Sequence, residues 1–309
     1  MEIRRVSPGQ GVEWFKQAID LGARNPRAVF GAALLLIATL YGVTLLMVLA
    51  MSLLVAAPVP GQAPELGRVM AVAMPLFVLM MLLIPVLFGG LMHVIREAEA
   101  GRPVRALDLY APLRAGQGKR LSLLGLVQIA LALLGGVLMV ALAGGDYWQQ
   151  YQQALQSMMS SGQVGAMPQP RHPGLLFVVQ MLFNYFSYAL MLLAIPLMLF
   201  SRRPLGAALR DSLRASVSNV GAHLVAGLLF IGAMIAAGIV VVLVAGLLGV
   251  LGNAIHASIG TLLVAVVLLG FAAAMLVLVA GGAYLAWRDT FGDAGSAHAS
   301  PPQVHGIEA

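Results

Sequence analysis

The sequence contains no cysteine and very little charge. Without cysteine, the chain has no disulfide framework, no thiolate metal ligand and no cysteine nucleophile. Charged residues make up only 10% of the chain, whereas a soluble domain carries about 25%. So few charged residues cannot cover a water-facing surface, and we therefore expect the bilayer to be the solvent for much of the protein.

In place of charge, the chain has long unbroken apolar runs, and hydrophobic residues reach 60% of the composition. In hydrocarbon, only helices and closed barrels satisfy the backbone hydrogen bonds. A barrel would show segments of about 10 residues with alternating polarity, and these runs do not alternate. The sequence therefore predicts an all-α polytopic membrane protein, with one transmembrane domain over residues 1–290 and a disordered cytoplasmic tail over 291–309.

Charged residues mark the ends of the predicted spans, because about 20 apolar residues are needed to cross the hydrocarbon core. The stretch 215–287 has no charged residue and is long enough for two spans or three. Its best turn signal is the sequence from Gly252 to His256, and a division at that point gives two. The six predicted spans are 28–57, 69–95, 121–144, 174–200, 220–251 and 257–287.

Lysine and arginine are distributed unevenly between the two sides of these spans. Sixteen of them fall on the side of both termini, and only Arg68 and Arg171 fall on the other. Flanking cations mark the cytoplasmic side, so both termini are predicted to be cytoplasmic. Topology therefore accounts for the net charge of +6, and nucleic acid is not an expected partner. The basic segments could hold anionic lipid headgroups, although topology alone would also produce them.

Two segments between spans have the pattern of amphipathic helices lying on the membrane surface. Residues 12–24 have an apolar and a charged face, with Trp14 at the boundary, where an indole favours the headgroup region. Residues 205–220 repeat this pattern, with Leu213 on the apolar face and Asp211 on the charged face.

The segment 106–118 occupies the matching place before the third span, but Pro112 interrupts it. The order of segments therefore predicts three copies of one unit, a short surface helix followed by a transmembrane hairpin, beginning near residues 1, 96 and 201. The alternative is that basic linkers become amphipathic without any repeat. The large external segment 145–173 is expected to contain a short helix near residues 149–159.

Ionisable residues inside spans usually mark ion coupling, and none of the six predicted spans contains Asp, Glu, Lys or Arg. This argues against an ordinary proton- or sodium-driven transporter. A milder polar path is formed by four candidate residues, of which the last three recur at helical spacing: Gln128, Gln180, Asn184 and Ser187. The alternative, which we favour, is hydrogen bonding between helices, measured at about 0.6–2 kcal/mol per contact.

The sequence offers no convergent catalytic, cofactor-binding or metal-binding set, so we expect no cofactor and no enzymatic activity. The best pair is His93 with Glu97, four residues apart on one helix face, which a solvated pair at a helix end explains. The predicted role is non-enzymatic and depends on assembly, lipid or partner contacts. The alternative is a small-molecule transporter or channel component with a mildly polar path along the fourth span.

Two short motifs carry a family resemblance. They are Gly11-x-x-Trp14-Phe15 leading to Asn25-Pro26, and Arg96-Glu97-Ala98-Glu99-x-Gly101-Arg102 after the second span. With the order of spans, they resemble a family of uncharacterised six-span inner-membrane proteins of Gram-negative bacteria. The resemblance implies an inner-membrane location and a six-span architecture, and it implies no site residues.

Overall fold

The computed structural model describes residues 3–55, 66–161 and 168–292, and within these residues it contains α-helices, one 3-10 helix and no strand. Six helices are long and apolar enough to cross a bilayer, which confirms the all-α polytopic fold. The stretch 215–287 contains two spans and not three. The six spans are α2 (Pro26–Leu54), α3 (Leu66–Glu99), α5 (Gly118–Ala143), α7 (Pro173–Leu199), α9 (Val220–Ile255) and α10 (Ala257–Phe291).

The six long helices begin and end within a few residues of the predicted span limits at most ends. Helices α9 and α10 are separated by the single residue His256, at the end of the predicted turn. The predicted tail begins too early, because Phe291 is the last residue of α10 and is only 3% exposed. The rest of that predicted tail, 293–309, and the predicted end of the first span at 56–57 lie outside the described residues.

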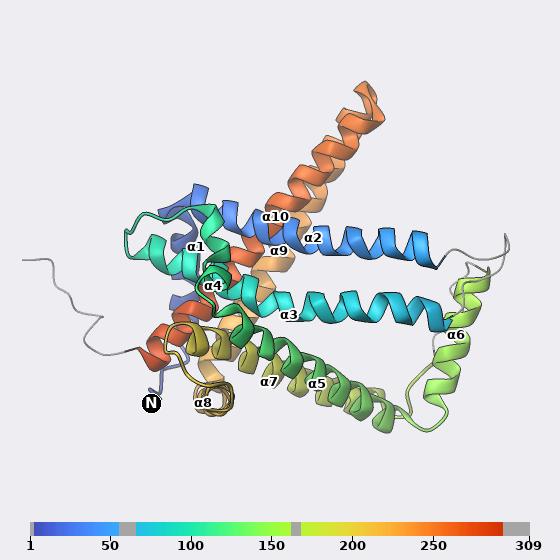
Figure 1. The fold of residues 1–309 in the computed structure, drawn as a ribbon, viewed down its shortest axis with the longest axis horizontal. Helices are drawn as coiled ribbons and strands as arrows, with labels where there is room; N and C mark the ends of the chain where they lie inside the picture. The colour runs from blue at the N-terminus through green and yellow to red at the C-terminus, as the bar shows by residue number, and fades with distance from the viewer. Residues whose placement is uncertain (1–2, 56–65, 162–167, 293–309) are drawn as a thin grey trace, which may run out of the picture.

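Four short helices lie at one end of the spans. They are α1 (Gln10–Arg24), η1 (Ala106–Tyr110), α4 (Ala111–Arg114) and α8 (Leu205–Ser218). We call these four helices and the adjoining span ends the platform. At the opposite, distal end, α6 (Tyr147–Ser161) runs across the direction of the neighbouring spans (Figure 1), which matches the short helix expected in the external segment.

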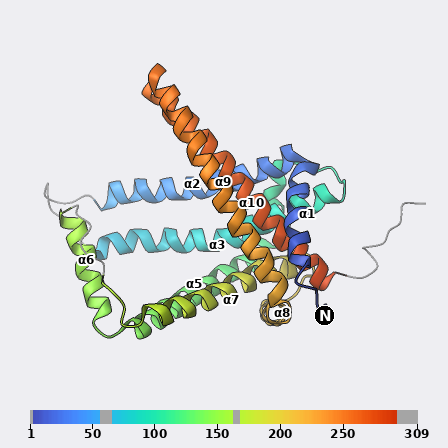
Figure 2. The same cartoon turned by 180° about the vertical axis from the view of Figure 1, so that it is seen from behind.

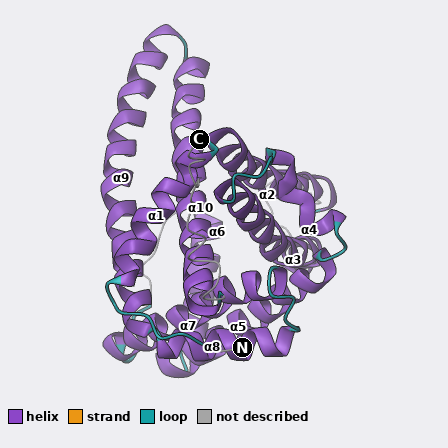
Figure 3. Ribbon diagram, turned by 90° about the vertical axis from the view of Figure 1, so that its left-hand side faces the viewer, coloured by secondary structure: helices purple, strands orange, loops and turns teal. Residues whose placement is uncertain are grey.

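The three hairpins diverge from the platform. Hairpins α2–α3 and α5–α7 run toward α6, whereas α9–α10 leaves the platform in a different direction (Figures 1 and 2). Figure 3 shows the same divergence from the side, with α9 and α10 standing apart from α2 and α3. Each hairpin packs along its own two helices, and the platform end of α10 also contacts α1, α2, α3 and α7.

Most fully buried apolar side chains lie in the platform, and the distal halves of the spans are exposed. The exposed fraction is 0% for Leu91 and Leu285, and it rises to 78% at Leu53 and 75% at Ile255. The platform therefore contains the packed core, while the distal halves present apolar surface to the bilayer. The largest buried side chains there include Trp14, Leu87, Leu91, Met92, Ile95, Leu109, Leu121, Leu193, Leu197 and Leu285.

The order of elements recurs three times, at the boundaries expected for three units: α1 with α2–α3, η1 and α4 with α5–α7, and α8 with α9–α10. Each short helix packs chiefly against the hairpin of another unit. Helix α1 contacts α9 and α10, η1 contacts α2 and α3, and α8 contacts α7. The three units thus interlock in a closed cycle, with α1 joining the first unit to the third.

The two longer platform helices bury their predicted apolar faces only in part, with Ala18 on α1 and Ser212 on α8 buried as predicted. Trp14 is not at a headgroup boundary but 1% exposed, because α1 packs against α9 and α10 rather than lying on lipid alone. On α8, Asp211 is buried at 4% and Leu213 is 44% exposed, the reverse of the prediction. The reason is that α8 turns a face of small and polar side chains toward α7: Ala208, Asp211, Ser212, Ala215 and Ser216.

Two glycines permit close approach between platform elements. A Cβ at Gly11 in α1 would lie 2.3 Å from the carbonyl oxygen of Ala222 in α9, and a Cβ at Gly90 in α3 would lie 1.8 Å from that of Leu109 in η1. Both contacts are to backbone, which cannot move aside as a side-chain tip can. Each glycine is therefore required by the interlock between units.

We predict that Gly11→Ala loosens α1 from α9 and lowers the free energy of unfolding by about 1–3 kcal/mol, the usual cost of overpacking. Thermal unfolding of the purified protein in detergent measures this change. Gly206→Ala in the first turn of α8 is the control, because nothing lies within 4 Å of its added Cβ. Equal midpoints for the two variants would contradict the close contact at Gly11.

Candidate functional site

The most extensive polar cluster of the described residues lies in the platform, where α1, α3 and α10 meet. The carboxylate of Glu99 accepts hydrogen bonds from the Arg288 guanidinium at 2.5 Å and from the Tyr284 hydroxyl at 2.7 Å. Arg288 also donates to Gln17 at 3.0 Å. One guanidinium thus connects the end of α3, the end of α10 and the middle of α1, three segments far apart in the sequence.

Asp289 extends this cluster to the start of α1. Its Oδ2 accepts from Trp14 Nε1 at 2.9 Å and from Gln10 Nε2 at 2.8 Å, and its Oδ1 accepts from Arg288 Nε at 3.2 Å. The indole of Trp14 is therefore held by a hydrogen bond inside the protein. We call Gln10, Trp14, Gln17, Glu99, Tyr284, Arg288 and Asp289 the seam cluster, because it joins the first unit to the third.

An aromatic group lies beside the seam cluster. The ring centroids of Phe200 and Trp287 are 5.0 Å apart, and that of Tyr284 is 6.0 Å from each. The Arg96 guanidinium lies 4.7 Å above the Phe200 ring, within the range of a cation–π contact. This contact attaches the end of α7 to α3 and α10, so all three hairpins meet here.

The chemistry available to the seam cluster is limited by how fully its groups are paired. Both carboxylates contact the same guanidinium, and their remaining donors are an indole, a phenol and an amide. A general acid or base must reach a substrate proton, whereas these oxygens are already occupied by protein donors. Within the described residues, no group of three or more His, Cys, Asp or Glu side chains is placed to hold a metal ion.

The four residues predicted to line a polar path are all half-buried. Gln180 Nε2 donates to Asn184 Oδ1 at 2.7 Å, one turn further along α7, so two of the four bind each other within one helix. Gln128 lies on α5 and Ser187 on α7. Among the described residues, the structure shows no side-chain hydrogen bond from either of them.

The other candidate pair, His93 with Glu97, is not joined by a hydrogen bond in the described part of the chain. Glu97 instead pairs with Arg102, with Arg102 Nη2 donating to Glu97 Oε1 at 2.7 Å. This hydrogen bond raises the pKa of Arg102. Glu97 is therefore occupied by a neighbouring cation just beyond the end of its own helix.

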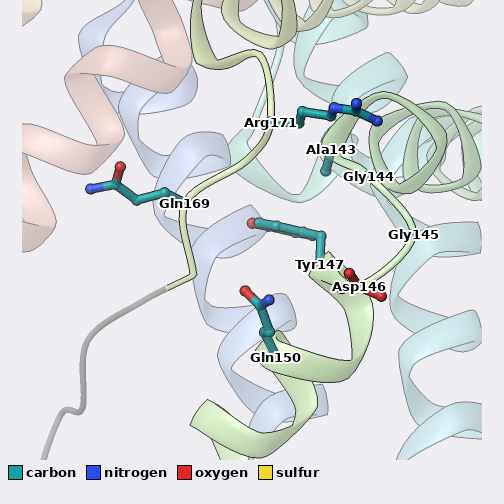
Figure 4. A pocket seen from close by; sticks show the side chains of 8 residues that line it. All are labelled: Ala143, Gly144, Gly145, Asp146, Tyr147, Gln150, Gln169 and Arg171. Carbon is teal, nitrogen blue, oxygen red and sulfur yellow. The ribbon is translucent and has the colours of Figure 1, made fainter.

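A pocket of about 260 Å³ lies at the distal end, where α5 turns into α6 (Figure 4). Ligand sites usually have volumes of about 300–1,000 Å³ and mostly apolar walls, whereas this pocket is smaller and mainly polar. It contains none of the four path residues. Its lining is Ala143, Gly144, Gly145, Asp146, Tyr147, Gln150, Gln169 and Arg171.

The seam cluster was not predicted from the sequence, because its ionisable members lie just beyond the predicted spans. Glu99 and Arg288 are separated by 189 positions, and a helical pattern gives no pairing at that distance. The available signals were the adjacent pair Arg288 and Asp289 at the end of the last apolar run and the two short motifs, which contain Trp14 and Glu99.

Comparison with protein-family models, curated proteins and solved structures found no match to this chain. The resemblance to six-span inner-membrane proteins therefore stays an expectation from the motifs, and the site is interpreted from its own geometry.

We predict that Glu99→Gln lowers the free energy of unfolding by about 1–3 kcal/mol, since it leaves the half-buried Arg288 without its strongest acceptor. Unfolding in a graded series of denaturing detergent measures the change. Glu97→Gln on the same helix is the control, because its partner Arg102 is 53% exposed and exposed pairs contribute less than about 1 kcal/mol. Equal losses would show that the seam cluster is no more than a surface ion pair.

Proposed function

We propose that this protein is a non-enzymatic, multi-pass protein of the bacterial inner membrane that acts as a scaffold through lipid and partner contacts. The single observation that carries the proposal is the division of the molecule into two parts. The platform has a packed core and paired polar groups, whereas the distal halves of three hairpins expose apolar side chains along most of their length. A packed platform with divergent apolar hairpins is suited to holding other membrane components in place.

The state of the polar groups supports a structural role for the platform. The two half-buried carboxylates of the seam cluster are occupied by Arg288 and by donors from α1 and α10. Paired charges of this kind fix the register of the elements that carry them. A catalytic site would instead need an ionisable group left open toward a substrate-sized pocket.

The orientation of the scaffold follows from its charge. The sixteen cations on the side of both termini lie in the segments that form or adjoin the platform, and Arg68 and Arg171 lie toward the distal end. Because the side rich in lysine and arginine is normally retained in the cytoplasm, the proposal has the platform in the cytoplasm and α6 in the external compartment.

The alternative function is a transporter or channel component lined by Gln128, Gln180, Asn184 and Ser187. The observation in its favour is the half-buried position of all four side chains on two neighbouring helices. Against it, Gln180 donates a hydrogen bond to Asn184 within α7, a contact inside one helix rather than the hydrogen bond between helices favoured from the sequence.

Single cysteines should report the orientation directly, because the natural chain has none. We expect Gln149→Cys on the exposed surface of α6 to react with a membrane-impermeant maleimide in intact spheroplasts. We expect Ala115→Cys in the platform to react only after the membrane is opened. The reverse pattern would overturn the cytoplasmic placement of the platform.

The scaffold and transport hypotheses differ in solute flux. In liposomes containing the purified protein, we expect trapped neutral and charged solutes to leave no faster than from protein-free liposomes. Faster release that is lost in the Gln180→Leu, Asn184→Leu variant and kept in Tyr188→Leu would establish the alternative. Tyr188 is a suitable control because it lies on the same helix and is 63% exposed.

A further inference from the structure

Helix α8 presents an outward face that its own packing does not use. The buried face meets α7, whereas Leu213 and Val217 on the other side are 44% and 58% exposed. Arg210 and Arg214 are exposed on the same helix. Figure 1 shows α8 end-on, so it lies across the direction of α5 and α7 at the limit of their apolar stretches. The exposed face therefore combines apolar and cationic side chains at the level where spans end.

The cations near this face greatly outnumber the acids. Segments 118–120 and 201–218 contain six lysines and arginines and one carboxylate, Asp211. That carboxylate is buried and binds Arg203, with Arg203 Nη2 to Asp211 Oδ2 at 2.8 Å. Of the other cations, only Arg210 has an ion-pair contact in the described part of the chain, a weaker one with Asp211 at 3.7 Å.

Hydrogen bonds bring the start of α5 to the same place. Arg120 donates to the backbone carbonyl oxygens of Arg202 and Arg203 at 3.2 and 3.0 Å. Lys119, the neighbour of Arg120, and Arg202 are both exposed. We call the combined region the α8 surface. It consists of Lys119, Arg120, Arg202, Arg210, Leu213, Arg214 and Val217.

Helix α1 shows that this excess of cations is not general in the platform. Its two acids and two cations balance, and Lys16 binds Glu13 at 3.1 Å. The α8 surface therefore differs from the other long platform helix in its excess of positive charge.

We propose that the α8 surface binds anionic phospholipids of the leaflet next to the platform, with arginines on the headgroup phosphates and Leu213 and Val217 among the first acyl carbons. Guanidinium groups match phosphate oxygens in a bidentate geometry, and their stems follow apolar surface while the charge stays at the boundary. The apolar pair favours a lipid over a soluble acidic partner. The inference rests on the proposed function and names the lipid chemistry of that scaffold.

The backbone at Arg202 provides a variant that separates binding from folding. Arg202 has φ 51°, a left-handed conformation that glycine adopts without steric cost. Arg202→Gly should therefore keep or raise the thermal midpoint while it removes one exposed cation. Loss of lipid affinity in this variant cannot be assigned to a damaged fold.

The affinity of the full-length protein for fluorescent phosphatidylglycerol is measured in phosphatidylcholine nanodiscs. One cation near an anionic surface changes affinity about fivefold, so Arg202→Gly should weaken binding about fivefold and Arg210→Gln with Arg214→Gln about twenty-five-fold. The matched control removes two platform cations elsewhere, Arg24→Gln with Arg27→Gln, and should change affinity less than about twofold. Equal losses in test and control variants would overturn the α8 surface as the site.

Two further experiments identify the molecule that binds to the α8 surface. Inorganic phosphate that displaces the lipid at equal ionic strength would show a free-anion site and overturn the lipid assignment. Val217→Cys provides the only thiol of the chain for a polarity-sensitive fluorophore, which we expect to report an apolar environment in phosphatidylglycerol nanodiscs. A label that stays in water would instead favour a soluble partner and contradict the proposal.

Failure of the lipid-binding proposal can be distinguished from failure of the proposed scaffold function. Solute flux through the polar path would refute the scaffold and leave the lipid affinities unchanged. Equal affinities in all variants, with no flux, would refute the α8 surface and leave the scaffold intact.

Discussion

Hydrocarbon gives apolar helices little reason to associate, because lipid tails are as apolar as the side chains they would replace. The spans of this protein therefore need specific contacts to hold them, and those contacts are concentrated in the platform. There, Arg288 binds Glu99, Asp289 and Gln17, and glycines such as Gly90 allow backbones to touch. The first two hairpins also pack together through α3 and α5, where a Cβ at Gly125 would lie 2.3 Å from the carbonyl oxygen of Met81. The distal part of α9–α10 instead runs away from the other two hairpins (Figure 1).

The closed cycle of units makes the N-terminal segment essential to the architecture. Helix α1 packs chiefly on the third hairpin and not on the hairpin of its own unit. Hydrogen bonds from the residues before α1 also connect the first unit to the third. The amide of Arg4 donates to the Thr290 carbonyl at 3.0 Å, and the Asn219 side chain binds Val6 N and Arg4 O at 2.9 and 3.0 Å. The segment from Arg4 to Val6 thus holds the end of α10 and the junction of α8 with α9 together.

The sequence was sufficient to predict six spans, the break at His256 and the order of short and long helices, because each depends on local composition. It could not give the orientation of α1 or α8 about its own axis. Amphipathic patterns assume a lipid and a water side, yet these helices have a third environment, a neighbouring helix. Trp14 and Asp211 are buried because they meet Asp289 and Arg203, and Leu213 is exposed because α8 packs through small residues.

Pairing between Glu99 and Arg288 depends on tertiary geometry that no local pattern contains. The four residues of the predicted polar path lie on α5 and α7. The one hydrogen bond among them in the described residues joins Gln180 to Asn184.

The length of the third hairpin connects these features. Helix α9 has 36 residues and would extend roughly 54 Å at 1.5 Å per residue, well beyond a core of about 30 Å. Such a helix must tilt in the bilayer, and its direction is set where it is held. Helix α10 is held by the seam cluster at its platform end, and α9 follows α8 through the buried Asn219. In the proposed complex, a lipid bound on α8 would therefore act on the same junction that sets the tilt of the hairpin. Under the proposed function, the bound leaflet and the angle of the α9–α10 hairpin would be mechanically linked, and the protein would respond in this way to the composition of its membrane.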